Sequence, residues 1–81
     1  MRLFSIKDTK ANHFSEPWFT PTNVHAIRIF KSSINREDPN NMLYLYPTEH
    51  ALYCLGEFDQ ETGDFTPELT LISTGEPHVQ K

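Results

Sequence analysis

The chain has 81 residues, which is enough for one domain but leaves little room for an enclosed catalytic pocket. A single cysteine, Cys54, excludes an intramolecular disulfide and is typical of a reducing compartment such as a cytoplasm, and no run approaches the roughly 20 apolar residues of a membrane span. The net charge of −4 hides an asymmetry: residues 1–36 carry six Lys or Arg against two Asp or Glu, residues 37–81 carry one against nine, and such sorting suggests one face for an anionic partner.

The first predicted element is a β-strand over Met1–Asp8, in which Phe4 and Ile6 alternate with charged or polar residues. The absence of a long apolar run argues against a signal peptide at this end. After a short polar turn, the aromatic segment Phe14–Thr20 predicts a brief returning strand. Pro17 would confine that strand to a sheet edge or a bulge.

The strongest local signal is a helix over about Val24–Glu37, with Thr22 or Asn23 as its N-cap and Pro39 ending it. A periodicity of 100° per residue divides it into two faces. The apolar stripe consists of Ala26, Ile27, Ile29, Phe30 and Ile34. The opposite face carries only basic charge and consists of His25, Arg28, Lys31, Ser32, Asn35 and Arg36.

The second half of the chain predicts a β-hairpin. A single helical turn at Asn40–Tyr46 precedes a strand over Ala51–Phe58, in which Leu52 and Cys54 face one side and Tyr53 and Leu55 the other. A polar turn at residues 59–64 then leads to a return strand over Phe65–Ser73, whose Pro67 belongs near its start or at a sheet edge.

These elements predict an α+β fold: a small antiparallel sheet of three or four strands covered by one main amphipathic helix. We expect one domain over residues 1–75 and a flexible C-terminal tail over residues 76–81.

No arrangement of residues points to catalysis. The four histidines have neither helical pair spacing nor a cysteine cluster, so no metal site is expected. The acidic residues at 59–64 lack the pattern of a calcium loop, and the three glycines form no phosphate loop. Cys54 lies in an apolar run and is predicted to be inert core. We therefore expect a protein that is not an enzyme and needs no cofactor.

Binding is the better interpretation. The basic helix face could lie against DNA phosphates, and the predicted contacts are Arg2, Lys7, Lys10, Arg28, Lys31, Asn35 and Arg36. Three aromatic residues near these charges could stack on bases: Phe14, Trp18 and Phe19. The alternative is that the basic face is only solvated and that the aromatic residues fill the core.

Several segments, in order, resemble a known family. They are the opening MRLFSIKDTKA, the aromatic EPWFTP, the helical HAIRIFK, the YP at 46–47 and LYCLGEFDQETGDF. Together, over roughly residues 1–66, they resemble the small nonstructural protein of the gokushoviruses, the single-stranded DNA phages of the Microviridae. The resemblance implies a non-catalytic protein of the bacterial host cytoplasm, absent from the mature virion and likened to microvirus protein C. That protein is thought to switch replication toward single-stranded genomes, in contact with DNA or the replication initiator.

The combined expectation is an accessory protein of phage genome replication that binds DNA, single-stranded more than double-stranded, through the basic helix face. The alternative is an adaptor that modulates the replication initiator or a host protein without touching nucleic acid, and a third reading is a structural assembly factor. We also expect a homodimer, with an edge strand or the Trp18 region as its contact, because so small a domain leaves apolar surface uncovered.

Overall fold

The structure is a computed structural model, and it describes residues 1–80. A five-stranded antiparallel sheet and one main helix confirm the α+β prediction, with more strands than the three or four expected. In chain order the elements are β1 (Arg2–Asp8), β2 (His13–Phe14), β3 (Trp18–Thr20), α1 (Asn23–Asn35), α2 (Met42–Leu45), the 3-10 helix η1 (Pro47–Glu49), β4 (His50–Phe58), β5 (Phe65–Thr74) and the 3-10 helix η2 (Glu76–His78).

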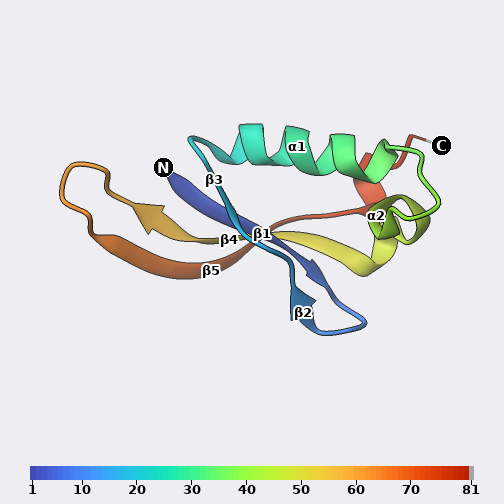
Figure 1. The fold of residues 1–81 in the computed structure, drawn as a ribbon, viewed down its shortest axis with the longest axis horizontal. Helices are drawn as coiled ribbons and strands as arrows, with labels where there is room; N and C mark the ends of the chain where they lie inside the picture. The colour runs from blue at the N-terminus through green and yellow to red at the C-terminus, as the bar shows by residue number, and fades with distance from the viewer. Residues whose placement is uncertain (81) are drawn as a thin grey trace.

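Strand β1 organises the sheet. The strand order is β2-β1-β4-β5, and β3 also pairs with β1 (Figure 1). The predicted return strand at residues 14–20 is thus two short strands that pair with β1 through Lys7↔Phe14 and Phe4↔Trp18. Pro17 lies between them, where its missing N–H interrupts no ladder.

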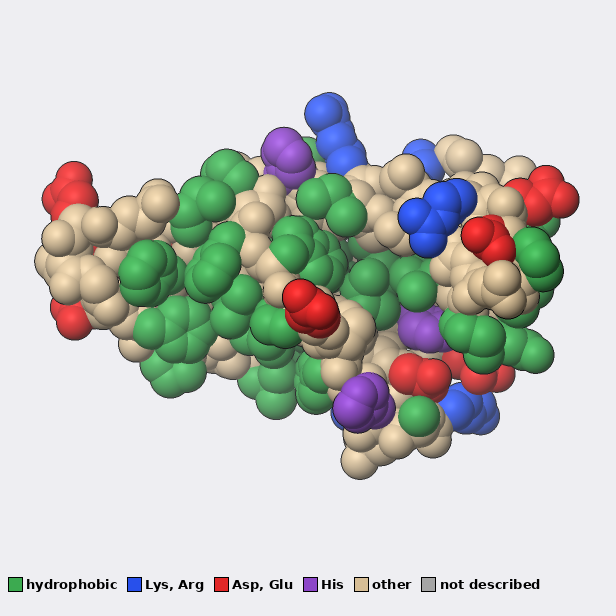
Figure 2. Space-filling model, in the orientation of Figure 1, with side chains coloured by type: hydrophobic (Ala, Val, Ile, Leu, Met, Phe, Trp, Pro, Cys, Tyr) green, Lys and Arg blue, Asp and Glu red, His purple; other side chains and the backbone are tan. Residues whose placement is uncertain are grey.

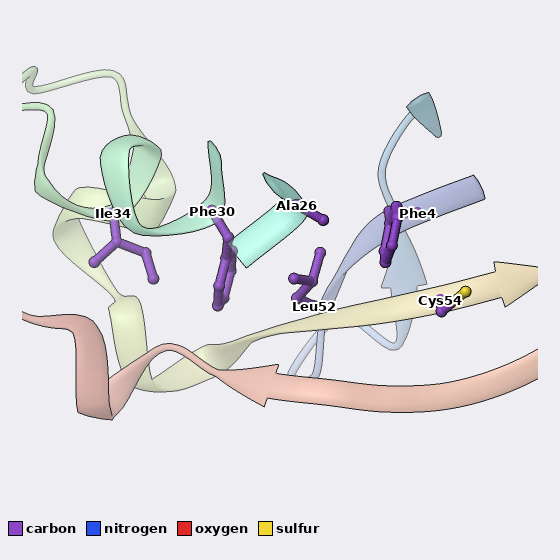
Figure 3. Packing of buried hydrophobic residues seen from close by; sticks show 6 residues of the cluster. All are labelled: Phe4, Ala26, Phe30, Ile34, Leu52 and Cys54. Atoms are coloured by element: carbon purple, nitrogen blue, oxygen red, sulfur yellow. The ribbon is translucent and has the colours of Figure 1, made fainter. Parts of the chain in front are cut away.

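Helix α1 covers one face of this sheet (Figure 1). It begins after Thr22, whose Oγ1 accepts a hydrogen bond of 3.1 Å from the backbone N–H of His25. Its predicted stripe is confirmed: Ala26, Phe30 and Ile34 are fully buried. Figure 3 shows these three side chains pointing from α1 toward the strands, where the buried core is completed by Phe4, Leu52 and Cys54.

Ile29 is an exception to the predicted stripe. It is 38% exposed, because it lies 100° around the helix from Phe30 and so at the margin of the contact with the sheet. Burial also raises the pKa of the Cys54 thiol, as expected for a cysteine in the core.

The C-terminal segment differs from the flexible tail that the sequence suggested. Residues 76–80 pack on α1, and Val79 contacts the core. The Asn35 side chain, in the last turn of α1, donates to the carbonyl of His78 at 2.8 Å and accepts from the N–H of Gln80 at 2.9 Å. His78 Nε2 and Ser73 Oγ share a hydrogen bond of 2.6 Å. The two Asn35 hydrogen bonds are nonlocal, and they hold a segment whose own sequence gives little local signal. Lys81 lies outside the described residues.

No helix covers the opposite face of the sheet within residues 1–80 (Figure 1), and Ser5 is the residue there that is fully buried, by its hydrogen bond to the loop residue Ser15. We call this face the open sheet face, and cross-strand register and alternation place on it Leu3, Ser5, Lys7, Phe14, Phe19, Tyr53, Phe58, Phe65, Pro67, Leu69 and Leu71. Leu69 and Leu71 are 66% and 51% exposed. Figure 2 shows hydrophobic side chains gathered over the strands to the left of α1 and below it.

The molecule is elongated, with extents of 42 × 23 × 20 Å. The turn between β4 and β5 extends beyond the N-terminal end of α1 and forms one tip (Figure 1). None of the described helices is long and apolar enough to cross a membrane.

Candidate nucleic-acid interface

Two cations of α1, Arg28 and Lys31, and its C-cap residue Arg36 gather on the side of the helix that faces away from the sheet. Arg28, Lys31 and Arg36 are exposed there, and we call these three residues the basic surface. Together with Ser32, Asn35 and Gln80 they line an open depression of about 500 Å³. None of the ion pairs among the described residues involves the basic surface. Its guanidinium and ammonium groups are therefore available to an anionic ligand.

Asn35 lies in this depression but is already engaged. Its Nδ2 donates to the carbonyls of Lys31 and His78, at 2.9 and 2.8 Å, and its Oδ1 accepts from the N–H of Gln80. Both amide protons are used, so Asn35 has none left for a phosphate. The structure gives this predicted DNA contact the role of joining α1 to the C-terminal segment.

Arg2 is separated from the basic surface by its own partners. Its Nε donates to Asn23 Oδ1 at 2.8 Å, and its guanidinium lies 3.5 Å from a Glu57 oxygen and 3.6 Å from a Glu68 oxygen. A hydrogen bond from the N-terminal ammonium, and then the charges of that ammonium and Arg2, lower the pKa of Glu57. Arg2 thus neutralises acids of the hairpin at the N-terminal end of α1, and a phosphate would have to displace them.

Lys7 and Lys10 belong to another part of the surface. Lys7 is on the open sheet face, where its Nζ lies 5.5 Å from the centre of the Phe14 ring and 6.0 Å from that of Tyr53. Lys10 is exposed in the turn between β1 and β2. The sheet therefore separates Lys7 from the basic surface on α1, and the two do not share a face.

The three aromatic candidates are divided between the two faces of the sheet. Trp18 packs against the core, 6.2 Å from Phe4 between ring centres, and its buried Nε1 has no hydrogen-bond partner among the described residues. Phe14 and Phe19 instead lie on the open sheet face, in contact with Tyr53 and Phe58 at 5.5 and 5.8 Å. Trp18 is thus part of the core, as in the alternative to base stacking. Phe14 and Phe19 lie on the side of the sheet opposite the basic surface.

Acidic groups concentrate at the β4–β5 turn. The turn carries Asp59, Glu61 and Asp64 and no basic residue. Asp59 Oδ1 accepts from the backbone N–H groups of Glu61 and Thr62, at 2.8 and 3.3 Å, and these hydrogen bonds lower the pKa of Asp59. Gly63 supplies the positive φ of 80° that closes the turn.

A small cavity of about 140 Å³ lies at the other end of the sheet, where Asp8, His13 and His50 meet apolar neighbours. His50 is buried, its Nδ1 lies 2.8 Å from the Tyr46 carbonyl and its Nε2 lies 4.0 Å from Asp8. Backbone N–H groups, that of Ala11 first, lower the pKa of Asp8. Within residues 1–80 no group of three or more His, Cys, Asp or Glu side chains could hold a metal ion.

Sequence reasoning missed two features of these surfaces. Gln80 reaches the basic surface only because Asn35 binds the C-terminal segment, and no local pattern signals that contact. The open sheet face had a signal, since β5 alternates apolar and polar residues from Phe65 to Leu71. The sequence could not say which side of the sheet α1 covers.

Comparison with known proteins shows the family of this chain. Residues 1–76 match the family described as Phage ORF5 protein. The chain belongs to this Phage ORF5 family. It is also 32% identical over 82 aligned positions to "Protein ORF5" of Chlamydia phage 1, a gokushovirus, with 94% of this chain and 85% of that relative covered. The resemblance to the small phage nonstructural protein is thereby confirmed.

The family match includes every strand and α1. In this Phage ORF5 protein the basic surface and the open sheet face thus both belong to the region shared with the family, whereas Val79 and Gln80 lie beyond it. No solved structure is matched by this chain.

Proposed function

We propose that this phage protein is a non-catalytic accessory factor of single-stranded DNA genome replication, acting in the host cytoplasm, that contacts DNA phosphates through Arg28, Lys31 and Arg36. The observation that supports it is the basic surface itself: three exposed cations around one open depression, without an acidic partner among the described residues. Membership of a phage family is compatible with this role.

The expected binding is electrostatic and independent of sequence, because phosphate contacts carry no base information. Arg2 is ion-paired, and Lys7 and Lys10 lie elsewhere, so three contacts remain. Each neutralised phosphate releases condensed counterions, and three contacts correspond to a log–log slope of affinity against salt of about −2 to −3. The acidic β4–β5 turn is at the end of the molecule away from the C-terminal end of α1 (Figure 1), so its charges should matter little.

The test is fluorescence anisotropy with labelled single-stranded and double-stranded oligonucleotides at several salt concentrations. Arg28→Ala/Lys31→Ala should weaken binding to all sequences and flatten the slope by about 1.5 to 2. Lys7→Ala/Lys10→Ala is the matched control, because it removes the same charge from another part of the surface and should leave the slope unchanged. A folded protein that binds no DNA at low salt would refute the proposal.

The second candidate is an adaptor that modulates the replication initiator or a host protein. The feature that favours it is the β4–β5 turn, whose exposed Asp59, Glu61 and Asp64 offer a basic partner protein a concentrated negative charge. Pull-down with the purified initiator, compared between wild type and Asp59→Asn/Glu61→Gln/Asp64→Asn, tests it: retention that the triple variant loses supports the adaptor.

A further inference from the structure

The apolar side chains of β5 face the side of the sheet that α1 does not cover. From Phe65 to Leu71 apolar and polar residues alternate, and in a half-buried strand the apolar row marks the face that is shielded from water. Here the apolar row points away from α1. The polar row, Thr66, Glu68 and Thr70, lies on the α1 side, where Glu68 meets Arg2. The strand is therefore patterned to bury the open sheet face.

The remaining strands extend the same apolar surface. Phe19 contacts Phe58, Phe14 contacts Tyr53, and the Phe65 ring lies over Gly56. Phe19, Phe65, Leu69 and Leu71 are 42–66% exposed and together offer about 400 Å² of apolar area. Their half-buried neighbours enlarge the patch toward the roughly 800 Å² per partner that a stable interface buries.

Charge indicates what covers this face. Lys7 is the one charged residue among the paired positions of the open sheet face, and Lys10 follows it in the β1–β2 turn. At the opposite end of the strands the β4–β5 turn carries three acids. A two-fold axis lying in the interface and across the strands would reverse a second copy end for end. It would bring Lys7 and Lys10 of one copy to the acidic turn of the other, twice, while Asp8 at the same end of β1 lies on the α1 side of the sheet.

We propose that two copies of this chain form a dimer by packing their open sheet faces together in this reversed orientation. The interface is isologous, with Phe19, Leu69 and Leu71 at its apolar centre and Lys7 opposite the partner's acidic turn. The sequence suggested an edge strand or the Trp18 region as the contact; here the edge strand β5 and Phe19, next to Trp18, contribute through the open sheet face and not through the strand edge. It also leaves the basic surface, on the far side of α1, exposed in both copies.

Sedimentation equilibrium of the full chain at micromolar concentrations tests the interface. The wild type should show twice the 9.4 kDa chain mass, and Leu69→Glu/Leu71→Glu should weaken association at least 100-fold with an unchanged circular dichroism spectrum, because both side chains are exposed in the single chain. Val24→Glu is the matched control: Val24 is 63% exposed, but on α1, and this variant should remain dimeric. A wild type that stays monomeric, or a dimer that Val24→Glu dissociates and the β5 variant does not, overturns the proposal.

Charge reversal tests the orientation. Lys7→Glu and Glu61→Lys should each weaken dimerisation several-fold, and the combined variant should recover most of the loss, because the pair is restored with opposite polarity. Loss without recovery overturns the reversed arrangement. Single-stranded DNA is the competing occupant: a monomeric wild type whose oligonucleotide binding is abolished by Leu69→Glu/Leu71→Glu would make this face a base-stacking platform and refute the dimer.

Discussion

On the face of the sheet that α1 covers, Phe4, Leu52 and Cys54 are fully buried, whereas on the opposite face Phe19, Leu69 and Leu71 remain about half exposed or more. Both faces are apolar, and they are made by the same strands. The difference lies in α1, which covers one face only. The alternation of apolar and polar residues in the strands therefore indicates which faces are suited to burial. Whether such a face is buried depends on whether a helix or a partner molecule covers it.

The largest expected effect is the loss of a large side chain from the covered face. Phe30→Ala should lower the free energy of unfolding by about 3–5 kcal/mol, because Phe30 is fully buried and its removal leaves a cavity. Leu69→Ala, on the open sheet face, should cost only about 0.5 kcal/mol in dilute solution, where any dimer is dissociated. Urea unfolding of both variants measures the contrast, and equal losses would contradict the distinction between the two faces.

Gly75 tests how tightly the covered side is closed. It is buried directly after β5, and an added Cβ would collide with the backbone carbonyl of Pro47 and lie 3.3 Å from Ile34. Gly75→Ala should therefore lower stability by about 1–3 kcal/mol. At Gly63 a Cβ would meet open space, but φ is 80°, so Gly63→Ala should cost only about 1 kcal/mol. Thermal melting compares them, and a larger loss at Gly63 would argue against close packing at Gly75.

Asn35 separates a stabilising role from DNA contact. Asn35→Ala removes three hydrogen bonds that join α1 to itself and to the C-terminal segment, and should cost about 1–2 kcal/mol of unfolding free energy. The salt slope for DNA should stay unchanged. Ser32→Ala, in the same depression, is the control and should change stability by less than about 0.5 kcal/mol. If Asn35→Ala has the wild-type free energy of unfolding but a lower affinity for DNA, Asn35 is a DNA contact and the stabilising role is refuted.

The smallest effect concerns the acidic turn, which α1 does not cover. The pKa of Asp59 is lowered in the fold, so the stability contributed by its ionised form is present above its unfolded pKa of about 3.9 and is lost as the pH falls through the lower folded value. Asp59→Asn should thus lower the urea midpoint more at pH 7 than at pH 2. Asp64→Asn, whose side chain accepts none of the turn's hydrogen bonds, should change the pH 7 midpoint less. If Asp59→Asn lowers the urea midpoint more at pH 2 than at pH 7, the ionised form of Asp59 does not stabilise the fold.

Local patterns carried much of the fold. The span and phase of α1, the N-cap at Thr22, the hairpin with its turn, and the opposite facing of Leu52 and Tyr53 all follow from the periodicity and residue preferences of short segments. The confirmed core positions of α1 belong to this group, since one helical period assigns Ala26, Phe30 and Ile34 together.

The candidate interface was less predictable. The seven polar candidates looked alike as charges or amides in sequence, yet Arg2 pairs with Glu57 and Glu68 from the other half of the chain. Asn35 binds the C-terminal segment in the same nonlocal way. Such partners depend on strand register and on which ends of the chain meet. Neither can be predicted from a short segment of the sequence.

The sequence by itself determined the helix with its basic and apolar sides, the hairpin, and the apolar alternation of β5, because each depends on neighbours a few residues apart. Only the tertiary structure decided that α1 lies on the side of the sheet away from the β5 apolar row, that Lys7 and the basic surface are on different faces, and that residues 76–80 pack on α1. The physical reason is that these outcomes depend on how whole elements are paired and packed. A helix stripe is equally apolar toward either face of a sheet, and the choice is made by the combined packing, ion pairs and hydrogen bonds of residues distant in sequence.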